Sequence, residues 1–370
     1  MINTEKISFC TLKFMPTKLF SIIQIKDIIF KNRLVISPMC QYSAKDGFAN
    51  DWHLVHLGSR AVGGAALIFQ EATAVSPEGR ISPEDLGIWS DDHIEKFKQI
   101  TAFIESQNAV PGIQIAHAGR KASMTSPWKG NQRILPKDGG WETFSPSDIA
   151  YKPIEFTTEL SPEGIQKVIS DFRSAAKRSL EAGYKVLEIH AAHGYLLHQF
   201  LSPLSNFRKD EYGGDFYGRI KIVLEIVEEV KKEWPENLPL FVRISATDWA
   251  PGGWNEEESI HLSAILKAKG VDVIDVSSGG NVHHQQIPVQ PNYQVSFAEN
   301  IKKQAKILTG AVGLITNAIQ AEAILQDEKA DFIFIARESL RNPNLGLTFA
   351  HDLNEEPFWP KQYERAQPKK

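Results

Sequence analysis

Short apolar runs alternate with longer segments of helical periodicity throughout this chain of 370 residues. Parallel strands need crossover connections, usually helices, so this alternation is typical of repeated strand–helix–strand units. Eight runs are candidate strands, at residues 33–38, 66–70, 111–116, 186–190, 240–244, 273–277, 311–315 and 332–335. The helical segments between them include 91–106, 162–182, 216–234, 256–269, 296–306 and 318–326.

The simplest arrangement of eight such units with right-handed crossovers is a (β/α)8 barrel of the triosephosphate-isomerase type, or TIM barrel. An open doubly wound sheet is the structural alternative. Single α/β barrels of about 250 residues or more are common, so one domain accommodates this length. We predict an α/β fold with one barrel over residues 19–353, an N-terminal tail at 1–18 and a C-terminal arm at 354–370.

The long segment 119–160, between the third and fourth predicted strands, is rich in Pro, Gly and Ser and contains Trp128 and Trp141. Long loops that carry aromatic side chains often cover a binding site, although others are plain surface insertions. We expect this segment to be a capping insertion that lies over the mouth of the barrel.

Charge and composition argue against several classes of protein. The net charge is −4 and the 41 Lys and Arg residues are scattered, which disfavours nucleic-acid binding. Two cysteines, Cys10 and Cys40, are too few for a disulfide framework or a cysteine-built metal site, so we expect a cytoplasmic protein. No run approaches the roughly 20 apolar residues of a membrane helix. The apolar run in the tail is too short for a signal peptide, and Met15 is an alternative start to Met1.

Polar or small residues follow the predicted strands at or just beyond their ends. They lie at 38–40, 71–72, 114–117, 190–193, 243, 277–279, 313 and 336–337. In a TIM barrel these ends form the active-site face. Any single one of these residues could merely cap its strand. A ring of buried His, Arg and Gln, however, costs free energy unless the groups are paired, so it indicates a polar ligand at the mouth.

The motif His190-Ala-Ala-His193-Gly-Tyr195 comes where the fourth predicted strand ends. Two imidazoles could ligate a metal, but no acidic ligand lies at a familiar spacing and Cys40 stands alone. A pair of N–H donors that polarises a carbonyl and stabilises an enolate fits better, and Tyr195 could then protonate the α-carbon. A packing role is the alternative for Tyr195.

A permanent positive charge and a phosphate site are predicted on the later strands. Arg243 would place its charge inside the mouth, which suits a cofactor that becomes an anion. The glycines of 310–313, ending at Gly313, with Ala336 and Arg337 after the last strand, resemble the phosphate sites common in barrels. No Gly-x-Gly-x-x-Gly follows a strand, so a separate dinucleotide-binding fold is not expected.

Several stretches together resemble the Old Yellow Enzyme family of flavoproteins, in particular its thermophilic-like class. The resemblance runs from about residue 19 to 365. The matching stretches are 31–42 (KNRLVISPMCQY), 112–121 (GIQIAHAGRK), 190–195 (HAAHGY), 201–206 (LSPLSN) and 210–214 (DEYGG).

This resemblance implies a single TIM barrel that binds FMN tightly and non-covalently. The first-strand residues would line one face of the flavin, with Cys40 tuning its redox potential, while Arg243 would stabilise the anionic reduced ring. The implied FMN contacts are Ser37, Pro38, Met39, Cys40, Ala72, Gln114, Arg243, Gly313, Ala336 and Arg337.

The resemblance also implies an ene-reductase. NADPH would reduce the flavin and leave, and an activated alkene such as an enone would then accept hydride at its β-carbon. His190 and His193 would hold the activating oxygen beside Tyr42, and Tyr195 would donate the proton. Relatives of this class are homodimers or homotetramers, and a motif like 362–365 (QYER) places an arginine, here Arg365, in the neighbouring subunit's active site. The residues after it, AQPKK, differ from the usual glycine and aromatic residue, and a solvated arginine is the alternative.

Three other functions remain open from the sequence. A dienoyl-CoA reductase shares the barrel but adds an iron–sulfur cluster, for which two cysteines are too few. A phosphate-binding lyase or aldolase commonly uses a Schiff-base lysine at a strand end, and no predicted strand end supplies one. A flavin-binding sensor is disfavoured by the intact His pair and Tyr195.

Overall fold

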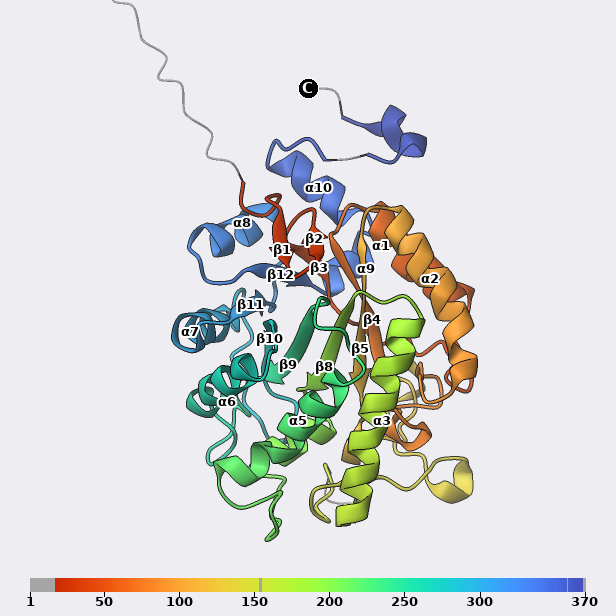
Figure 1. Cartoon of the computed structure of the whole chain (residues 1–370), viewed down its shortest axis with the longest axis vertical. Coiled ribbons are helices and arrows are strands. Elements are labelled where there is room, and N and C mark those ends of the chain that lie inside the picture. The colour runs from red at the N-terminus through yellow and green to blue at the C-terminus, as the bar shows by residue number, and fades with distance from the viewer. Residues whose placement is uncertain (1–16, 153–154, 358, 369–370) are drawn as a thin grey trace, which may run out of the picture.

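Eight parallel strands close into a barrel in the order β3-β4-β5-β8-β9-β10-β11-β12 (Figure 1). The computed structural model describes residues 17–152, 155–357 and 359–368, so Cys10, Met1 and Met15 lie outside the described residues. The predicted TIM barrel is therefore confirmed over the open-sheet alternative. The barrel strands are β3 (Leu34–Ile36), β4 (Leu67–Ala74), β5 (Val110–Ala116), β8 (Val186–Ala191), β9 (Leu240–Ser245), β10 (Val273–Ser277), β11 (Leu308–Ala311) and β12 (Phe332–Ile335). Two short pairs lie outside it, β1 (Ile23–Ile25) with β2 (Ile28–Phe30) and β6 (Phe144–Ser145) with β7 (Thr158–Glu159).

Helices surround the barrel, and capping side chains define where several of them begin. Ser161 accepts a hydrogen bond from the backbone of Gly164 at the start of α3, and Asn255 does the same for Glu258 in α6. None of the helices in the described ranges is long and apolar enough to cross a bilayer. The helices are α1 (Asp51–Val62), α2 (Ile94–Ser106), α3 (Pro162–Glu181), α4 (Leu196–Leu201), α5 (Phe216–Lys231), α6 (Glu256–Ala268), α7 (Val295–Ala305), α8 (Ala318–Gln326), α9 (Arg337–Arg341) and α10 (Leu345–Asp352).

The seventh barrel strand begins earlier than the sequence predicted. The apolar run 311–315 was the candidate, but β11 ends at Ala311. Gly313 (φ 130°) and Leu314 (φ 51°) adopt left-handed backbone, which interrupts an extended strand. The prediction was wrong because hydropathy alone does not report this turn.

An aromatic core fills the barrel at the amino-terminal end of its strands. Phe241 lies 5.9 Å from Phe69 and 6.1 Å from Phe332 between ring centroids, and Phe332 packs edge-on against Phe30 of β2. All four rings are buried. The β1–β2 hairpin thus closes this end, and the polar residues occupy the other end.

Phe241→Ala is expected to lower the free energy of unfolding by about 3–5 kcal/mol, the usual cost of removing a buried aromatic ring. Urea denaturation at a fixed FMN concentration measures this. Phe156→Ala is the control, because Phe156 is 86% exposed and its removal should change stability by less than about 0.5 kcal/mol. Equal losses in the two variants would contradict the assignment of this core.

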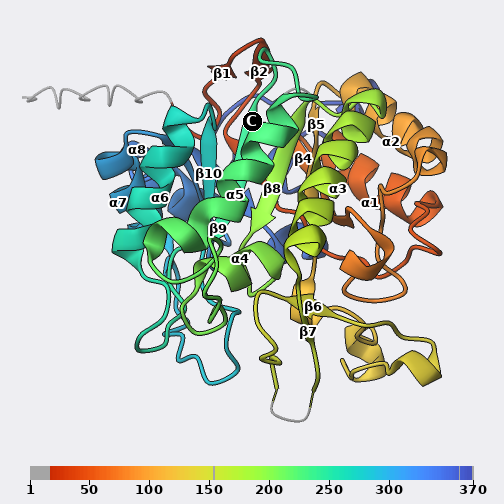
Figure 2. The same ribbon diagram turned by 60° about the horizontal axis from the view of Figure 1, so that its bottom comes forward.

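The capping insertion lies at the carboxyl end of the barrel strands (Figure 2). Trp128 packs edge-on against Tyr42, with ring centroids 5.7 Å apart. Arg120 Nη1 donates to the backbone oxygen of Ile149, and its Nη2 donates to that of Asn281 at 2.7 Å. The insertion is thereby tied to the loops that follow β3 and β10.

Candidate active site

The His motif forms one cluster where β8 ends. The rings of His190 and His193 are 5.1 Å apart at 86°, and Tyr195 lies 5.1 Å from His190. His190 is buried on β8 beside Arg243 of β9, its register partner. The structure therefore brings together both predicted donors and the predicted proton donor.

A left-handed turn aims His193 into the mouth. His193 has φ 59° and Gly194 has φ 70°, and a Cβ on Gly194 would lie 2.1 Å from the backbone oxygen of Gly280. The backbone N–H of His193 donates to Ser245 Oγ at 2.9 Å, and its Nε2 lies 2.7 Å from Ser277 Oγ. Contacts of both the backbone and the ring therefore fix the position of the His193 imidazole.

Lys121 is a neighbour of this turn to which the sequence analysis gave no role. Its Nζ donates to the backbone oxygens of His193 at 2.8 Å and Gly280 at 3.0 Å, and it lies 5.2 Å from the centre of the Tyr195 ring. Burial, and then repulsion from Arg120, lowers the pKa of Lys121 to about 8. The available signal was a lysine in the short 3-10 turn Gly119–Lys121 that follows β5.

Burial sets the protonation states of the cluster. Desolvation, and then the charge of Arg243, lowers the pKa of both His190 and His193 well below the usual range. Burial raises the pKa of the Tyr195 phenol well above its usual range. Near neutral pH the cluster therefore offers neutral imidazoles and a protonated phenol, which can donate hydrogen bonds and one proton.

A polar layer lies beneath the cluster inside the barrel. Gln114 donates to Glu188 Oε1 at 2.7 Å, and Arg243 Nε lies 3.0 Å from Asp275 as an ion pair. Burial raises the pKa of Glu188 well above its usual range and that of Asp275 to about 6, although Arg243 opposes both shifts. Arg243 is thus a fixed positive charge held in place by Asp275.

The first-strand residues form one wall of the mouth. Ser37 is buried, and its Oγ has no hydrogen-bond partner among the described residues. Pro38, Met39 and Cys40 are half-buried, and burial raises the pKa of the Cys40 thiol well above its usual range. The Cys40 thiol is therefore neutral near pH 7, and the Ser37 hydroxyl is free to bind a ligand.

A β-bulge in β4 lies at Ala72, next to the first-strand residues, because β4 pairs with β3 and the Ala72 backbone interacts with the Cys40 thiol. The pairing of β4 with β5 shifts register between Gln70 and Ala72, so that Ala72 pairs with Gln114. The sequence analysis ended this strand at residue 70, whereas β4 continues to Ala74. Ala72 therefore lies within a bulged strand.

A cavity of about 210 Å³ lies where β11 and β12 end. Its lining includes Gly313, Ala336, Arg337 and Arg341. A Cβ on Gly313 would lie 3.1 Å from the Gln294 side chain, so glycine keeps this wall open. The lining includes Gly313, Ala336 and Arg337 of the predicted phosphate site but not Gly310, and it adds Arg341.

Arg365 is not near this mouth. It lies in a 3-10 turn, Lys361–Ala366, beyond α10. Both views place the C-terminal arm at the end of the barrel opposite the capping insertion (Figures 1 and 2). The arm therefore does not reach the active site of its own chain.

Comparison with known proteins shows the family of this chain. A family model described as the NADH:flavin oxidoreductase / NADH oxidase family matches residues 18–356. The chain belongs to this family, the Old Yellow Enzyme family. It is 49% identical over 355 residues to an NADPH dehydrogenase of Bacillus subtilis (strain 168), with 95% of this chain and 100% of the relative covered. An NADPH dehydrogenase of Listeria welshimeri is 48% identical over 357 residues, with 95% and 99% covered.

Solved structures of low sequence identity share the fold. Morphinone reductase has a TM-score of 0.78 at 24% identity, with 93% of this chain and 92% of that chain covered. An old yellow enzyme homologue from Zymomonas mobilis has a TM-score of 0.77 at 24% identity, with 96% and 100% covered. The family model and the curated relatives identify an NADPH-dependent flavin oxidoreductase whose cofactor is FMN.

The residues of this Old Yellow Enzyme relative fit FMN. Buried polar atoms normally have partners, yet Ser37 Oγ and His190 Nδ1 have none among the described residues, as expected for groups that await a ligand. Arg243 supplies positive charge at one end of the mouth, and the open cavity beside Gly313 and Arg337 suits a phosphate at the other.

Proposed function

We propose that this flavin oxidoreductase is an ene-reductase, which reduces C=C bonds conjugated to a carbonyl or a similar activating group. The observation that carries the proposal is the cluster of two neutral imidazoles and one protonated phenol, His190, His193 and Tyr195, where β8 ends. When bound, FMN supplies the hydride, which originates from NADPH, to the β-carbon of the alkene.

The chain's own residues activate and protonate the substrate. His190 and His193 donate hydrogen bonds to the activating oxygen and stabilise the negative charge that develops there. Tyr195 donates its proton to the α-carbon, and Tyr42 lies beside the substrate. Burial keeps the two imidazoles neutral, so this pair adds no positive charge next to the substrate oxygen.

The remaining predicted residues would hold the cofactor. Arg243 would place its charge against the electron-rich form, and Arg337 would bind the phosphate. The others are the first-strand residues and residues at the ends of other strands, namely Ser37, Pro38, Met39, Cys40, Ala72, Gln114, Gly313 and Ala336. The Cys40 thiol is neutral and would tune the flavin potential as a weak donor.

An anaerobic titration tests the function. The purified protein is reduced with NADPH and mixed with cyclohexenone while the flavin absorbance is recorded. We expect the flavin colour to return with one equivalent of cyclohexanone formed. If oxygen reoxidises the flavin but the enone does not, the proposed substrate class is wrong.

Arg337→Ala is expected to raise the Kd of FMN about 10- to 150-fold, because a hydrogen bond to a charged group contributes about 1.5–3 kcal/mol. Fluorescence titration of the apoprotein measures this Kd. Riboflavin, which lacks the phosphate, is the matched control ligand, and its Kd should not change. A similar loss for both ligands would show that Arg337 acts on the fold and not on the phosphate.

We propose a homodimer or homotetramer in which Arg365 enters the mouth of a neighbouring copy. The proposal is supported by the position of the arm, which lies far from its own mouth. Arg365→Ala should raise the KM for cyclohexenone about tenfold, the loss of one charged hydrogen bond, while FMN stays bound. Light scattering gives the oligomeric state. A monomer with an unchanged KM in the variant would contradict the arrangement.

A further inference from the structure

We propose that His198 and Asp248 are positioning residues, a buried pair that holds the backbone N–H of Gly194 and thereby positions the phenol of Tyr195. The inference rests on the proposed function, because it concerns the proton that Tyr195 donates. Neither residue reaches the mouth, since both side chains are fully buried below it. Their effect on the reaction would therefore pass through the backbone of Gly194.

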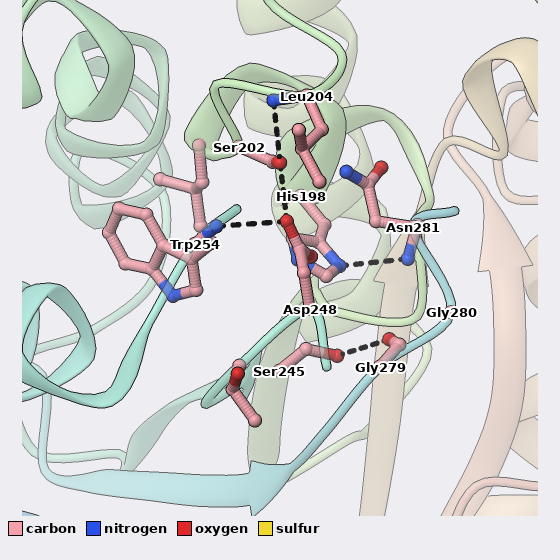
Figure 3. Close-up of polar contacts among 12 residues, drawn as sticks. His198, Ser202, Leu204, Ser245, Asp248, Trp254, Gly279, Gly280 and Asn281 are labelled. Carbon is pink, nitrogen blue, oxygen red and sulfur yellow. Dashed lines mark hydrogen bonds and ion pairs between the residues drawn. The ribbon is translucent and has the colours of Figure 1, made fainter. Parts of the chain in front are cut away.

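The Asp248 carboxylate is held by three groups (Figure 3). Its Oδ1 lies 2.8 Å from His198 Nε2. Its Oδ2 accepts hydrogen bonds from Ser202 Oγ and from the backbone N–H of Trp254, the latter at 2.9 Å. Although burial alone would raise its pKa, interactions with His198 and the other donors lower the pKa of Asp248 below its usual range. The carboxylate is therefore ionised and fixed in orientation.

The contact with Gly194 determines which nitrogen of His198 carries a proton. The backbone N–H of Gly194 donates to His198 Nδ1 at 2.9 Å. A backbone N–H can only donate, so Nδ1 must be unprotonated. The ring proton then sits on Nε2 and faces the Asp248 carboxylate. Asp248 thus selects the tautomer of His198 that can accept from Gly194.

Loss of the contact between Gly194 and His198 should displace Tyr195 more than His193. His193 has its own anchors, to Ser245 and Ser277, which do not involve His198. Gly194 is held by its N–H through His198 and by its backbone oxygen, which accepts from Gln199 Nε2 at 2.7 Å. The Gly194 N–H belongs to the peptide between His193 and Gly194. His193 is fixed by its own anchors, so a shift of this peptide is passed on to Tyr195, whose backbone N–H donates to the oxygen of Ala192 at 3.1 Å.

Asp248→Asn keeps the side-chain volume nearly constant but replaces one acceptor oxygen of the carboxylate with a donor. If the new amide N–H₂ faces His198 Nε2, that nitrogen must accept and Nδ1 becomes protonated, which opposes the Gly194 N–H. If the amide is turned the other way, its N–H₂ meets the N–H of Trp254 instead. Either orientation leaves two donors facing each other in a buried site, which costs free energy.

The test compares two substrates that differ in their need for the enzyme's proton. A ketone enolate is a strong base and must be protonated in place. A nitronate, formed from a nitroalkene, is a weak base that water can protonate after release. Asp248→Asn is expected to lower kcat for cyclohexenone at least tenfold, part of the roughly hundredfold or larger contribution of a positioned proton donor. Its kcat for a nitroalkene should change by less than about threefold, a difference of roughly 0.6 kcal/mol.

Ser259→Ala is the matched control. Ser259 is buried, accepts from the Trp254 indole N–H and does not touch Asp248 or His198. It should lower the melting temperature while keeping the ratio of the two kcat values. If Asp248→Asn does not retain FMN, His198→Asn replaces it with the same expectation.

Two results would overturn the inference: equal losses with both substrates, as a general loosening of the fold produces, or no loss with cyclohexenone. The unaltered enzyme is measured alongside. If it does not turn over cyclohexenone, the proposed function fails, and that outcome is distinct from a failure of the positioning role.

Discussion

His193→Ala lowers kcat/KM for cyclohexenone by about 100- to 1,000-fold while FMN remains bound. Losing one donor to a developing oxyanion typically costs about 2.7–4 kcal/mol in the barrier. His190→Ala has an effect of the same order, because both rings would donate to one oxygen. Steady-state kinetics under anaerobic conditions measure the loss, and the flavin absorbance of the gel-filtered variants reports the bound cofactor.

His261→Ala is the control for this prediction. His261 is exposed on α6 and stacks on Phe216, with ring centroids 4.5 Å apart, on the outside of the barrel. Its removal should leave kcat/KM unchanged. If His193→Ala and His190→Ala retain full activity, the imidazoles do not clamp the substrate oxygen.

Tyr195→Phe lowers kcat for cyclohexenone by about 100-fold or more, the usual contribution of a positioned general acid. The ring and its contact with His190 remain, so the change isolates the hydroxyl. Stopped-flow reoxidation of the reduced enzyme by the enone measures the affected half-reaction.

Tyr212→Phe is the matched control, because it also removes a phenol hydroxyl but outside the His cluster. The Tyr212 hydroxyl donates to Glu225 at 2.9 Å and accepts from Gln166, far from the His cluster in the chain's fold. It should reduce stability without changing the half-reaction. Unchanged enone reduction in Tyr195→Phe would assign the proton to another donor.

The barrel was predictable because its parallel strands are buried on both faces and read as continuous apolar runs. β9 and β12 matched their predicted runs within one residue for this reason. β11 did not, because the left-handed backbone at Leu314 is invisible to hydropathy. The β1–β2 hairpin was not among the predicted strands, since three-residue strands carry too little pattern.

The site was predictable where its residues are close in sequence. His190 at the end of β8 and His193 and Tyr195 just after it are close in sequence, so their spacing brings them together. Partners from other strands were not predictable in the same way. The contact of His193 with Ser277 and the reach of Lys121 to the His193 backbone oxygen depend on strand registers and side-chain paths that only the folded barrel sets.

The fate of the transferred hydrogen tests the central claim most directly. NADPH carrying deuterium at both C4 positions is used in ordinary water with cyclohexenone, and the product is examined by NMR and mass spectrometry. We expect cyclohexanone with one deuterium at the β-carbon and a hydrogen from water at the α-carbon. Cyclohexenol labelled at the carbonyl carbon, or a product without deuterium, would contradict this claim.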